Sequence, residues 1–257
     1  MLLCIDIGNT NLVLGLWKEG KWLAQWRIRT DREKMPDEYV LLLKALLGDR
    51  GYDLRSVTRV VIGSVVPRLK KVFRDLFEEY VRVHPLILGP GVRTGLRILI
   101  DNPTELGADL VADAVAAYHR LRTACIIVDF GTATTFSAVS AEGDFLGVAI
   151  APGLEVAVDA LSSSTAQLPR ISLSAPPKVI GTNTVHSMQS GLIYGYVGLV
   201  EGLIKRIRQE LGEGAQVIAT GGLSRILAPY TREFNLVDPE LTLDGLRIIG
   251  ERNLPPE

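Results

Sequence analysis

The stretch that decides the fold is Cys4-Ile5-Asp6-Ile7-Gly8-Asn9-Thr10-Asn11, an apolar strand that ends in an acidic residue and a turn of small residues. A near copy of it returns at Val128-Asp129-Phe130-Gly131-Thr132-Ala133-Thr134-Thr135. Each copy predicts a tight β-hairpin whose turn displays backbone N–H groups beside a carboxylate. One such turn would be ordinary hairpin chemistry, in which the Asp side chain bonds the turn itself. Two of them, at Asp6 and Asp129, predict a duplicated domain with two phosphate-facing loops across a cleft.

The composition favours a globular protein with a small-molecule partner. Of the 257 residues, 47% are hydrophobic, which is enough for a substantial core and too many for a disordered chain. The net charge of −1 gives no electrostatic reason to bind nucleic acid or an anionic membrane. Cys4 and Cys125 each precede one of the two turns, and we expect buried, reduced thiols and therefore a cytoplasmic location. Met1 leads directly into a strand, without the pattern of a signal peptide.

The order of the expected elements indicates an α/β protein. The first half should contain three strands and then helix, strand, helix and strand, at residues 2–7, 12–17, 22–29, 37–47, 59–64, 69–80 and 81–88. This order is the layout of a ribonuclease-H-like half. From Thr123 the same order of elements begins again, with a strand, an Asp-x-Gly turn and two strands. We therefore predict two ribonuclease-H-like domains, at residues 1–116 and 117–257.

A helix over residues 104–121 is expected to join the domains, with Asn102 as its N-cap. Three acids spaced four residues apart lie on it, namely Glu105, Asp109 and Asp113. We expect the first and the third to lie on a solvated face. Asp109 differs because Gly107-Ala108 removes side-chain bulk from the turn just before it, which makes it a candidate functional residue.

A second long helix is expected over residues 187–211, with glycines at close to four-residue spacing: Gly191, Gly195, Gly198 and Gly202. Apolar residues cover most of its circumference, so it should be buried, either between domains or against a second subunit. Charged residues such as Glu201 and Lys205 interrupt the apolar run, which excludes a transmembrane helix.

The first turn has the chemistry of a phosphate loop. Phosphoryl transfer requires positioned cations, donors for phosphate oxygens and a base for the attacking hydroxyl. Asp6 offers a hard oxygen ligand for Mg²⁺, directly or through water. Gly8 lets the backbone approach a phosphate, and the residues 9–11 supply further donors.

The second turn offers the same set through Asp129 and Gly131, with the hydroxyl groups of Thr132, Thr134 and Thr135. A strand over residues 216–220 runs into Gly221-Gly222, and a glycine pair at the end of a strand leaves room for a base or ribose. Neither a Walker A sequence nor a Gly-x-Gly-x-x-Gly dinucleotide loop is present in the sequence, which removes the commonest competing nucleotide folds.

These motifs resemble the acetate kinase/sugar kinase/Hsp70/actin superfamily and, within it, the type III pantothenate kinases. The two Asp-x-Gly turns are typical of the superfamily, and Gly107-Ala108-Asp109 with the chain length is typical of this kinase. The resemblance covers nearly the whole chain. Further matching segments are Ser64-Val65-Val66-Pro67, Thr94-Gly95-Leu96, Asn102-Pro103, Pro152-Gly153, Asn183-Thr184 and Gly221-Gly222.

The resemblance implies two actin-like ATPase domains with a nucleotide cleft between them. It implies a homodimer that phosphorylates pantothenate with ATP in the first step of coenzyme A biosynthesis. Asp109 would be the general base, and Asp129 would ligate a monovalent cation such as K⁺ or NH₄⁺. The residues expected at ATP are Asp6, Ile7, Gly8, Asn9, Thr10, Asn11, Leu12, Val13, Thr132, Gly221 and Gly222. The residues expected at pantothenate are Gly107, Ala108, Asp109, Leu110 and Thr184.

Leu110 departs from the family pattern, in which an arginine that helps to hold pantothenate follows Gly-Ala-Asp. Two interpretations stay open. Leu110 either faces the substrate or lies on the buried face of its helix, one turn beyond Leu106. The departure also leaves two rival functions, a kinase for another small hydroxylated acid and a nucleotide-binding regulatory protein without turnover.

Overall fold

The computed structural model describes residues 1–255, which form two compact units. The first unit comprises residues 1–96 and 101–116 together with the chain from Thr242 onward, and the second comprises residues 97–100 and 117–241. The expected ranges, 1–116 and 117–257, share the division after Ala116. They differ in the C-terminal segment, which groups with the first unit rather than the second.

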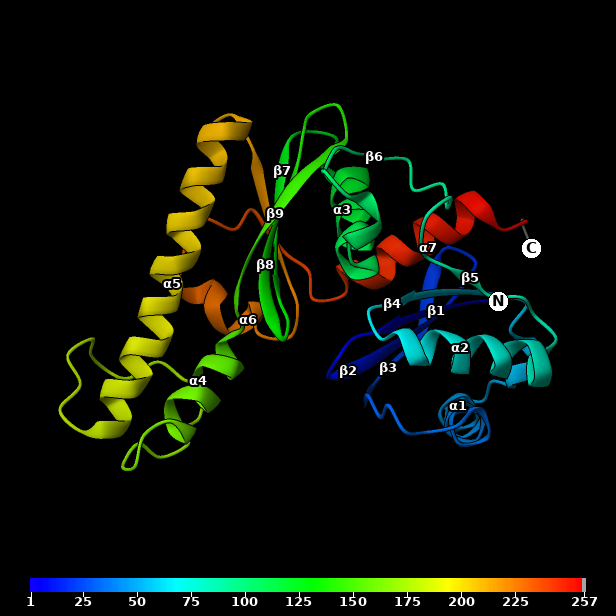
Figure 1. The fold of residues 1–257 in the computed structure, drawn as a ribbon, viewed down its shortest axis with the longest axis horizontal. Coiled ribbons are helices and arrows are strands. Elements are labelled where there is room, and N and C mark those ends of the chain that lie inside the picture. Colours follow the sequence, from blue (N-terminus) through cyan, green and yellow to red (C-terminus); the bar gives the residue numbers. More distant parts are fainter. Residues whose placement is uncertain (256–257) are drawn as a thin grey trace. The chain divides into compact units, whose positions relative to one another are not determined.

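The first unit is built on a five-stranded sheet in the order β3-β2-β1-β4-β5. Its strands are β1 Leu2–Ile7, β2 Asn11–Lys18, β3 Lys21–Arg29, β4 Arg59–Ser64 and β5 Leu86–Ile87. The central strand β1 runs antiparallel to β2 and parallel to β4. Helices α1 (Pro36–Asp49) and α2 (Pro67–Leu76) pack against each other and contribute Tyr39, Phe73 and Leu76 to the core over this sheet (Figure 1).

The second unit is built on a six-stranded sheet in the order β11-β10-β7-β8-β9-β6. Its strands are β6 Arg97–Ile98, β7 Cys125–Phe130, β8 Ala133–Val139, β9 Asp144–Pro152, β10 Gln216–Thr220 and β11 Leu236–Val237. Strand β7 runs antiparallel to β8 and parallel to β10. The helices are α4 (Leu154–Ser163), α5 (Thr184–Leu211) and the short α6 (Ser224–Leu227).

The two sheets repeat one topology, which confirms the predicted duplication. Strands β9-β8-β7-β10-β11 follow the order and directions of β3-β2-β1-β4-β5, and β6 is added beside β9. Asp6 and Asp129 occupy the same place in β1 and β7. Each is partly exposed in a strand whose other five residues are buried. Cys4 and Cys125 are buried free thiols, as expected, and burial raises the pKa of Cys125 to about 12.

Two expected elements are shorter than the sequence pattern suggests. The predicted strand 81–88 is reduced to β5, because the helical turn Phe77–Val81 continues from α2 and Arg82 then adopts a left-handed backbone (φ 62°). The predicted helix 104–121 begins only at Ala108, as α3 (Ala108–Leu121). Asn102 caps a separate 3-10 turn, Pro103–Glu105, and the extended backbone of Leu106 (ψ 124°) separates that turn from α3.

Helix α5 begins three residues earlier than expected, where the Asn183 side chain accepts a hydrogen bond from the backbone N–H of His186 (2.9 Å). It runs along one face of the second sheet (Figure 1). Within one chain this helix is not buried on all sides, and its expected burial against a second subunit stays a prediction. Tyr196, Val200 and Ile204 are buried on one stripe, whereas the glycines are not enclosed: a Cβ added at Gly191, Gly195 or Gly198 would meet no atom within 4 Å.

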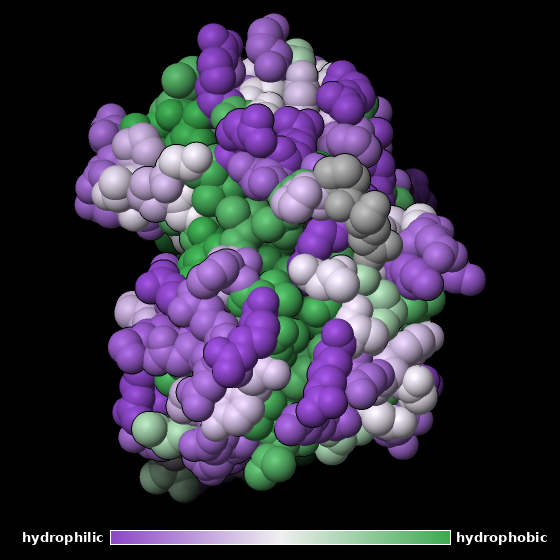
Figure 2. Space-filling model, turned by 90° about the vertical axis from the view of Figure 1, so that its right-hand side faces the viewer, coloured by the Kyte–Doolittle hydropathy of each residue, from purple (hydrophilic) through white to green (hydrophobic). Residues whose placement is uncertain are grey.

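The last helix, α7 (Leu241–Asn253), returns the chain to the first unit. Gly245 lies so close to α3 that an added Cβ would come within 1.9 Å of the Ala112 carbonyl oxygen. Figure 2 shows one face of the molecule, on which polar and charged side chains surround smaller apolar areas. Within residues 1–255, no helix combines the length and the hydropathy needed to cross a bilayer.

Candidate active site

The first loop is a tight turn at the end of β1. The backbone N–H of Gly8 donates to the Asn11 carbonyl oxygen (3.0 Å), and a Cβ at Gly8 would lie 3.0 Å from the same oxygen. Asn9 and Thr10 are exposed at the tip, so the turn presents donors to solvent. Ile7 and Leu12 are fully buried, which leaves only their backbone groups for contact with a ligand.

Asp6 stands opposite Val13 on β2 and Gly63 on β4. Directly opposed residues of neighbouring strands share a face of the sheet, so Asp6 and Val13 lie on the same face beside the turn. On this face the Asp6 carboxylate stands beside a glycine. A single carboxylate ligand suits Mg²⁺, which keeps several waters and takes its remaining ligands from substrate phosphates. No group of three or more His, Cys, Asp or Glu side chains able to hold a metal occurs among the described residues.

The second loop surrounds Asp129 with glycines. A Cβ at Gly221, whose φ is 85°, would lie 2.5 Å from Asp129 Oδ1, and a Cβ at Gly131 would lie 3.4 Å from Asp129 Oδ2. The structure thus brings Asp129, Gly131 and Gly221 together. Thr132 and Gly222 are exposed beside them. Only glycine fits both the positive φ of Gly221 and the space left by the carboxylate.

Two hydroxyl groups distinguish this loop from the first. Asp129 stands opposite Thr135 on β8 and Thr220 on β10, where Asp6 has Val13 and Gly63. Thr135 Oγ1 and Thr220 Oγ1 are buried and have no hydrogen-bond partner among the described residues. A buried hydroxyl without a partner is costly. The oxygen atoms of these three side chains on one face therefore fit a cation that binds oxygen ligands. Thr135 is one of the donors predicted for the second turn, whereas Thr220 joins the set only through the pairing of β10 with β7.

A tyrosine holds the second loop from behind. The Tyr196 hydroxyl of α5 hydrogen-bonds the Thr134 hydroxyl and donates to the Pro152 carbonyl oxygen (2.6 Å). Next to it, a Cβ at Gly153 would come within 2.1 Å of the Thr132 carbonyl oxygen. The turn at Thr132 is therefore packed against the end of β9. In the sequence, Tyr196 is one of several residues on the apolar face of a helix. That pattern does not predict that its hydroxyl makes hydrogen bonds.

Asp109 lies in the first turn of α3, in the first unit. Its Oδ1 accepts a hydrogen bond from the backbone N–H of Leu110 (2.8 Å). A Cβ at Gly107 would lie 2.4 Å from the same Oδ1, so the expected removal of bulk does make room for this carboxylate. Burial raises the pKa of Asp109, and backbone hydrogen bonds from Leu110 and from its own N–H partly oppose that rise. A partly buried carboxylate with a raised pKa is a stronger proton acceptor than an exposed one.

The residues around Asp109 divide between solvent and core. Glu105 is exposed and accepts from the Asn102 side chain (2.7 Å), as predicted. Asp113 was predicted on the solvated face, and this is wrong: it is 1% exposed, and Thr242 donates its hydroxyl to Asp113 Oδ1 (2.7 Å). Leu110 is 8% exposed, beside the buried Val111, which favours the core interpretation of that residue.

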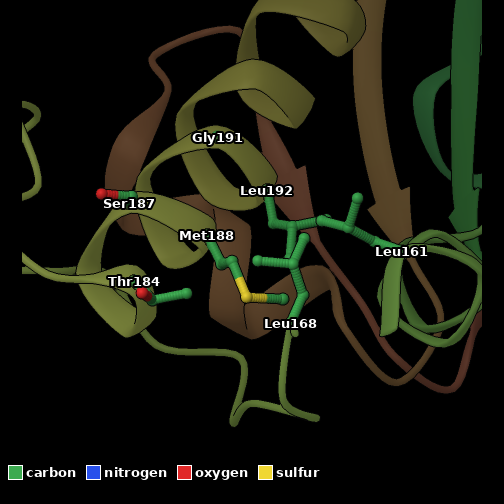
Figure 3. A pocket seen from close by; sticks show the side chains of 7 residues that line it. All are labelled: Leu161, Leu168, Thr184, Ser187, Met188, Gly191 and Leu192. Carbon is green, nitrogen blue, oxygen red and sulfur yellow. The ribbon is translucent and has the colours of Figure 1, made fainter. Parts of the chain in front are cut away.

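Thr184, the remaining predicted pantothenate contact, lies in the second unit at a pocket of about 460 Å³ (Figure 3). The pocket is lined by Leu161, Leu168, Thr184, Ser187, Met188, Gly191 and Leu192. The side chains of Leu161, Leu168 and Met188 converge in Figure 3, whereas Ser187 points away from them. The pocket is apolar with a threonine at its edge, which suits a small molecule that carries methyl groups and a few polar atoms.

Two sheets of one topology, each with an acid before a glycine turn, form the two-domain, ribonuclease-H-like fold that sugar kinases also have. Solved structures agree on the fold. An inorganic polyphosphate/ATP-glucomannokinase from Arthrobacter sp. strain KM superposes with a TM-score of 0.50 at 16% identity, over 98% of this chain and 99% of that chain. The ethanolamine utilization protein EutJ from Carboxydothermus hydrogenoformans superposes with a TM-score of 0.57 at 16% identity, over 96% and 89%.

Sequence relatives define the family. The profile of type III pantothenate kinase matches residues 2–206. Type III pantothenate kinases from Myxococcus xanthus (strain DK1622) and Moorella thermoacetica (strain ATCC 39073 / JCM 9320) are 49% and 48% identical to this chain. Each alignment covers 98% of this chain, with 99% and 100% of the respective relative. The chain therefore belongs to the type III pantothenate kinase family. The predicted activity, ATP-dependent phosphorylation of pantothenate in coenzyme A biosynthesis, is confirmed at the level of the family.

Proposed function

We propose that this protein transfers the γ-phosphoryl group of ATP to the primary hydroxyl of pantothenate, with Asp109 as the general base. The carboxylate of Asp109 accepts the hydroxyl proton, the resulting oxygen forms the new bond to phosphorus, and the bond to ADP breaks. The observation that carries the proposal is the setting of Asp109 against Gly107, where burial raises its pKa. The hydrogen bond from Leu110 N–H fixes one carboxylate oxygen, which leaves the other for the substrate.

ATP would be held by the two glycine turns. In the first loop, residues 6–13 offer backbone and side-chain donors to the phosphates, and Asp6 would hold Mg²⁺, which neutralises phosphate charge. In the second loop, Thr132 would contact ATP, and Gly221-Gly222 would border the nucleoside. The exposure of Asn9, Thr10 and Thr132 supports these roles.

A monovalent cation, K⁺ or NH₄⁺, would bind at Asp129. The support is the oxygen set on that face, the Asp129 carboxylate with the buried hydroxyls of Thr135 and Thr220. Large monovalent cations favour several oxygen ligands of modest charge, such as carbonyl and hydroxyl groups. The first loop, with Val13 and Gly63 at the corresponding positions, lacks this set.

Pantothenate would contact residues 107–109 and Thr184, whereas the buried Leu110 would pack in the core. Because position 110 is not an arginine, the carboxylate of pantothenate must bind other hydrogen-bond donors. The apolar pocket at Thr184 would accept an aliphatic part of the substrate.

The protein is further proposed to be a cytoplasmic homodimer. The glycine stripe of α5 leaves its outer side open, and the nearby Val179 and Ile180 are 63% and 83% exposed. Apolar exposure of this kind marks an interaction surface. Light scattering of the intact chain at micromolar concentration measures the mass, and a monomer would count against the dimer.

The experiment that tests the function is ADP formation with and without pantothenate, in Mg²⁺ and K⁺ buffer. ADP release that depends on pantothenate is the expected result. Turnover with other hydroxylated acids but not with pantothenate would favour the rival kinase. ATP binding without turnover on any acceptor would favour the regulatory protein. A parallel series in Na⁺ buffer tests the monovalent site, and we expect slower turnover there.

A further inference from the structure

An open depression of about 590 Å³ lies in the first unit beside the tip of the first loop. It is lined by Asn9, Arg29, Thr30, Asp31, Arg32 and Lys34. Apart from Asn9, these residues come from the end of β3 and the segment that leads to α1. Asn9 belongs to the first loop, whereas the other five residues lie outside the predicted ATP and pantothenate sites.

The segment is fastened to the phosphate loop by three hydrogen bonds. Thr30 donates through its hydroxyl to the Gly8 carbonyl oxygen (2.7 Å) and through its backbone N–H to the Thr10 carbonyl oxygen (2.9 Å). Arg32 Nη2 donates to Asn9 Oδ1 (2.8 Å). The segment is secured on its other side, where the Tyr39 hydroxyl donates to the Asp31 carbonyl oxygen (2.7 Å). The tip of the loop and residues 30–32 therefore form one connected structure.

The bond from Arg32 fixes which way the Asn9 amide points. A guanidinium carries only donors, so the oxygen of the amide must face Arg32. The amide NH₂ group then faces away from Arg32, where it can donate to a phosphate oxygen. Without Arg32 the amide could turn over and present its oxygen, which would repel a phosphate.

The depression is also basic. Arg29, Arg32 and Lys34 line it, and Asp31 supplies the opposing charge. That carboxylate is engaged by Lys34 Nζ (3.1 Å) and by the backbone N–H of Glu33 (3.0 Å). A guanidinium has five N–H groups, and the bond to Asn9 uses one of them. Arginine is suited to bind phosphate because its fork matches two phosphate oxygens.

We propose that Arg32 positions the Asn9 amide and that the depression it forms with Arg29 and Lys34 binds the polyphosphate chain of the nucleotide. The proposal rests on the proposed use of ATP but not on pantothenate as the acceptor. It assigns a phosphate-recognition role to a segment outside the glycine turns.

The test is calorimetric titration of the intact chain with ATP, ADP and AMP in Mg²⁺ buffer, without acceptor. In Arg32→Met, which keeps the apolar stem, we expect ATP and ADP to bind about tenfold more weakly and AMP less than twofold more weakly. Arg55→Ala is the matched control, since it removes an exposed arginine of the same unit that does not line the depression. It should bind all three nucleotides like wild type.

A second variant keeps the proposal testable if Arg32→Met is unstable. Arg32→Lys retains the charge but loses the fork, and it should show a smaller loss for ATP than Arg32→Met, again with little change for AMP. Wild-type affinity for ATP in either variant would overturn the proposal, as would an equal loss for ATP and AMP, which indicates a structural role. Wild-type binding of ATP without phosphorylation of pantothenate would overturn the proposed function and leave this inference standing.

Discussion

The Tyr196 hydroxyl on α5 donates a hydrogen bond to the Pro152 carbonyl oxygen, 2.6 Å away, and thereby joins the long helix to the end of β9 beside the second loop. It also hydrogen-bonds the Thr134 hydroxyl, and Thr134 is fully buried. Since Gly153, the next residue after Pro152, packs against the carbonyl of Thr132, this single hydroxyl supports the turn proposed to contact ATP.

Replacing Tyr196 by Phe should therefore loosen the second loop. The ring still packs in the core, but two buried polar groups lose their partner, at a cost of about 1–3 kcal/mol. We expect KM for ATP to rise several-fold with a smaller change in kcat, measured by steady-state kinetics. Tyr194→Phe on the same helix is the control, because it keeps the ring contact with Tyr230. If both variants give the same KM for ATP, Tyr196 has no positioning role.

Asp109→Asn should separate activity from stability. We expect kcat to fall by a factor on the order of 10²–10⁴, the usual contribution of a positioned base. ATP binding should be unchanged. Because burial raises the pKa of Asp109, its charge destabilises the folded state at neutral pH. This penalty shrinks as the pH falls through the raised pKa and is gone below the ordinary pKa of an aspartate. The neutral Asn variant should accordingly unfold at pH 7 no more easily than wild type.

The pH profile provides the companion measurement. A base with a raised pKa loses activity as the pH falls through that pKa. The fall of kcat/KM on the acid side should therefore occur at a higher pH than the ordinary pKa of an aspartate. Denaturant unfolding at pH 7 measures the stability. A variant that keeps turnover within a few-fold of wild type would show that Asp109 is not the base.

Thr220→Val tests the oxygen set at Asp129. The substitution keeps the shape of a side chain that is 1% exposed and removes a hydroxyl with no hydrogen-bond partner among the described residues. Stability without added K⁺ should be equal or higher, because the cost of the unpaired hydroxyl is gone. The K⁺ concentration for half-maximal activity should rise about tenfold. Ser137→Ala, a buried hydroxyl of the same kind that stands opposite Ile127 rather than Asp129, is the control and should leave the K⁺ dependence unchanged.

Much of the fold could be predicted because its determinants are local. The strand 2–7 and the strand 59–64 follow directly from apolar runs with a turn at each end, and the repeated Asp-x-Gly turn predicts the duplication. The contents of the site depend on pairing across the sheet. Thr135 lies opposite Asp129 through the predicted hairpin, but Thr220 comes to lie beside Asp129 only through the pairing of β10 with β7, which no local pattern specifies.

The burial of Asp113 shows why the sequence did not predict the surroundings of α3. Its spacing from Asp109 is that of a solvated helix face, yet its partner is Thr242, 129 residues further along the chain. The C-terminal segment returns to the first unit and covers this face of α3. The order of the chain alone assigns the C-terminal helix to the second domain. Asp113 is then expected to be exposed, because the helix that covers it is expected in the other domain.

Leu110→Arg tests the residue that departs most clearly from the family. Restoring the arginine would lower KM for pantothenate about ten- to a hundredfold if the position faced the substrate, since a charge-assisted contact is worth roughly 1.5–3 kcal/mol. Leu110 is, however, 8% exposed, and the neighbouring Val111 is 7% exposed. An unpaired charge in such a place costs several kcal/mol. We therefore expect Leu110→Arg to melt well below wild type, with no gain in KM. Leu110→Met, which conserves volume, should cost less than about 1.5 kcal/mol and keep KM unchanged. Thermal unfolding and pantothenate kinetics of the two variants decide the matter: an arginine variant that melts like wild type and binds pantothenate more tightly would place position 110 at the substrate.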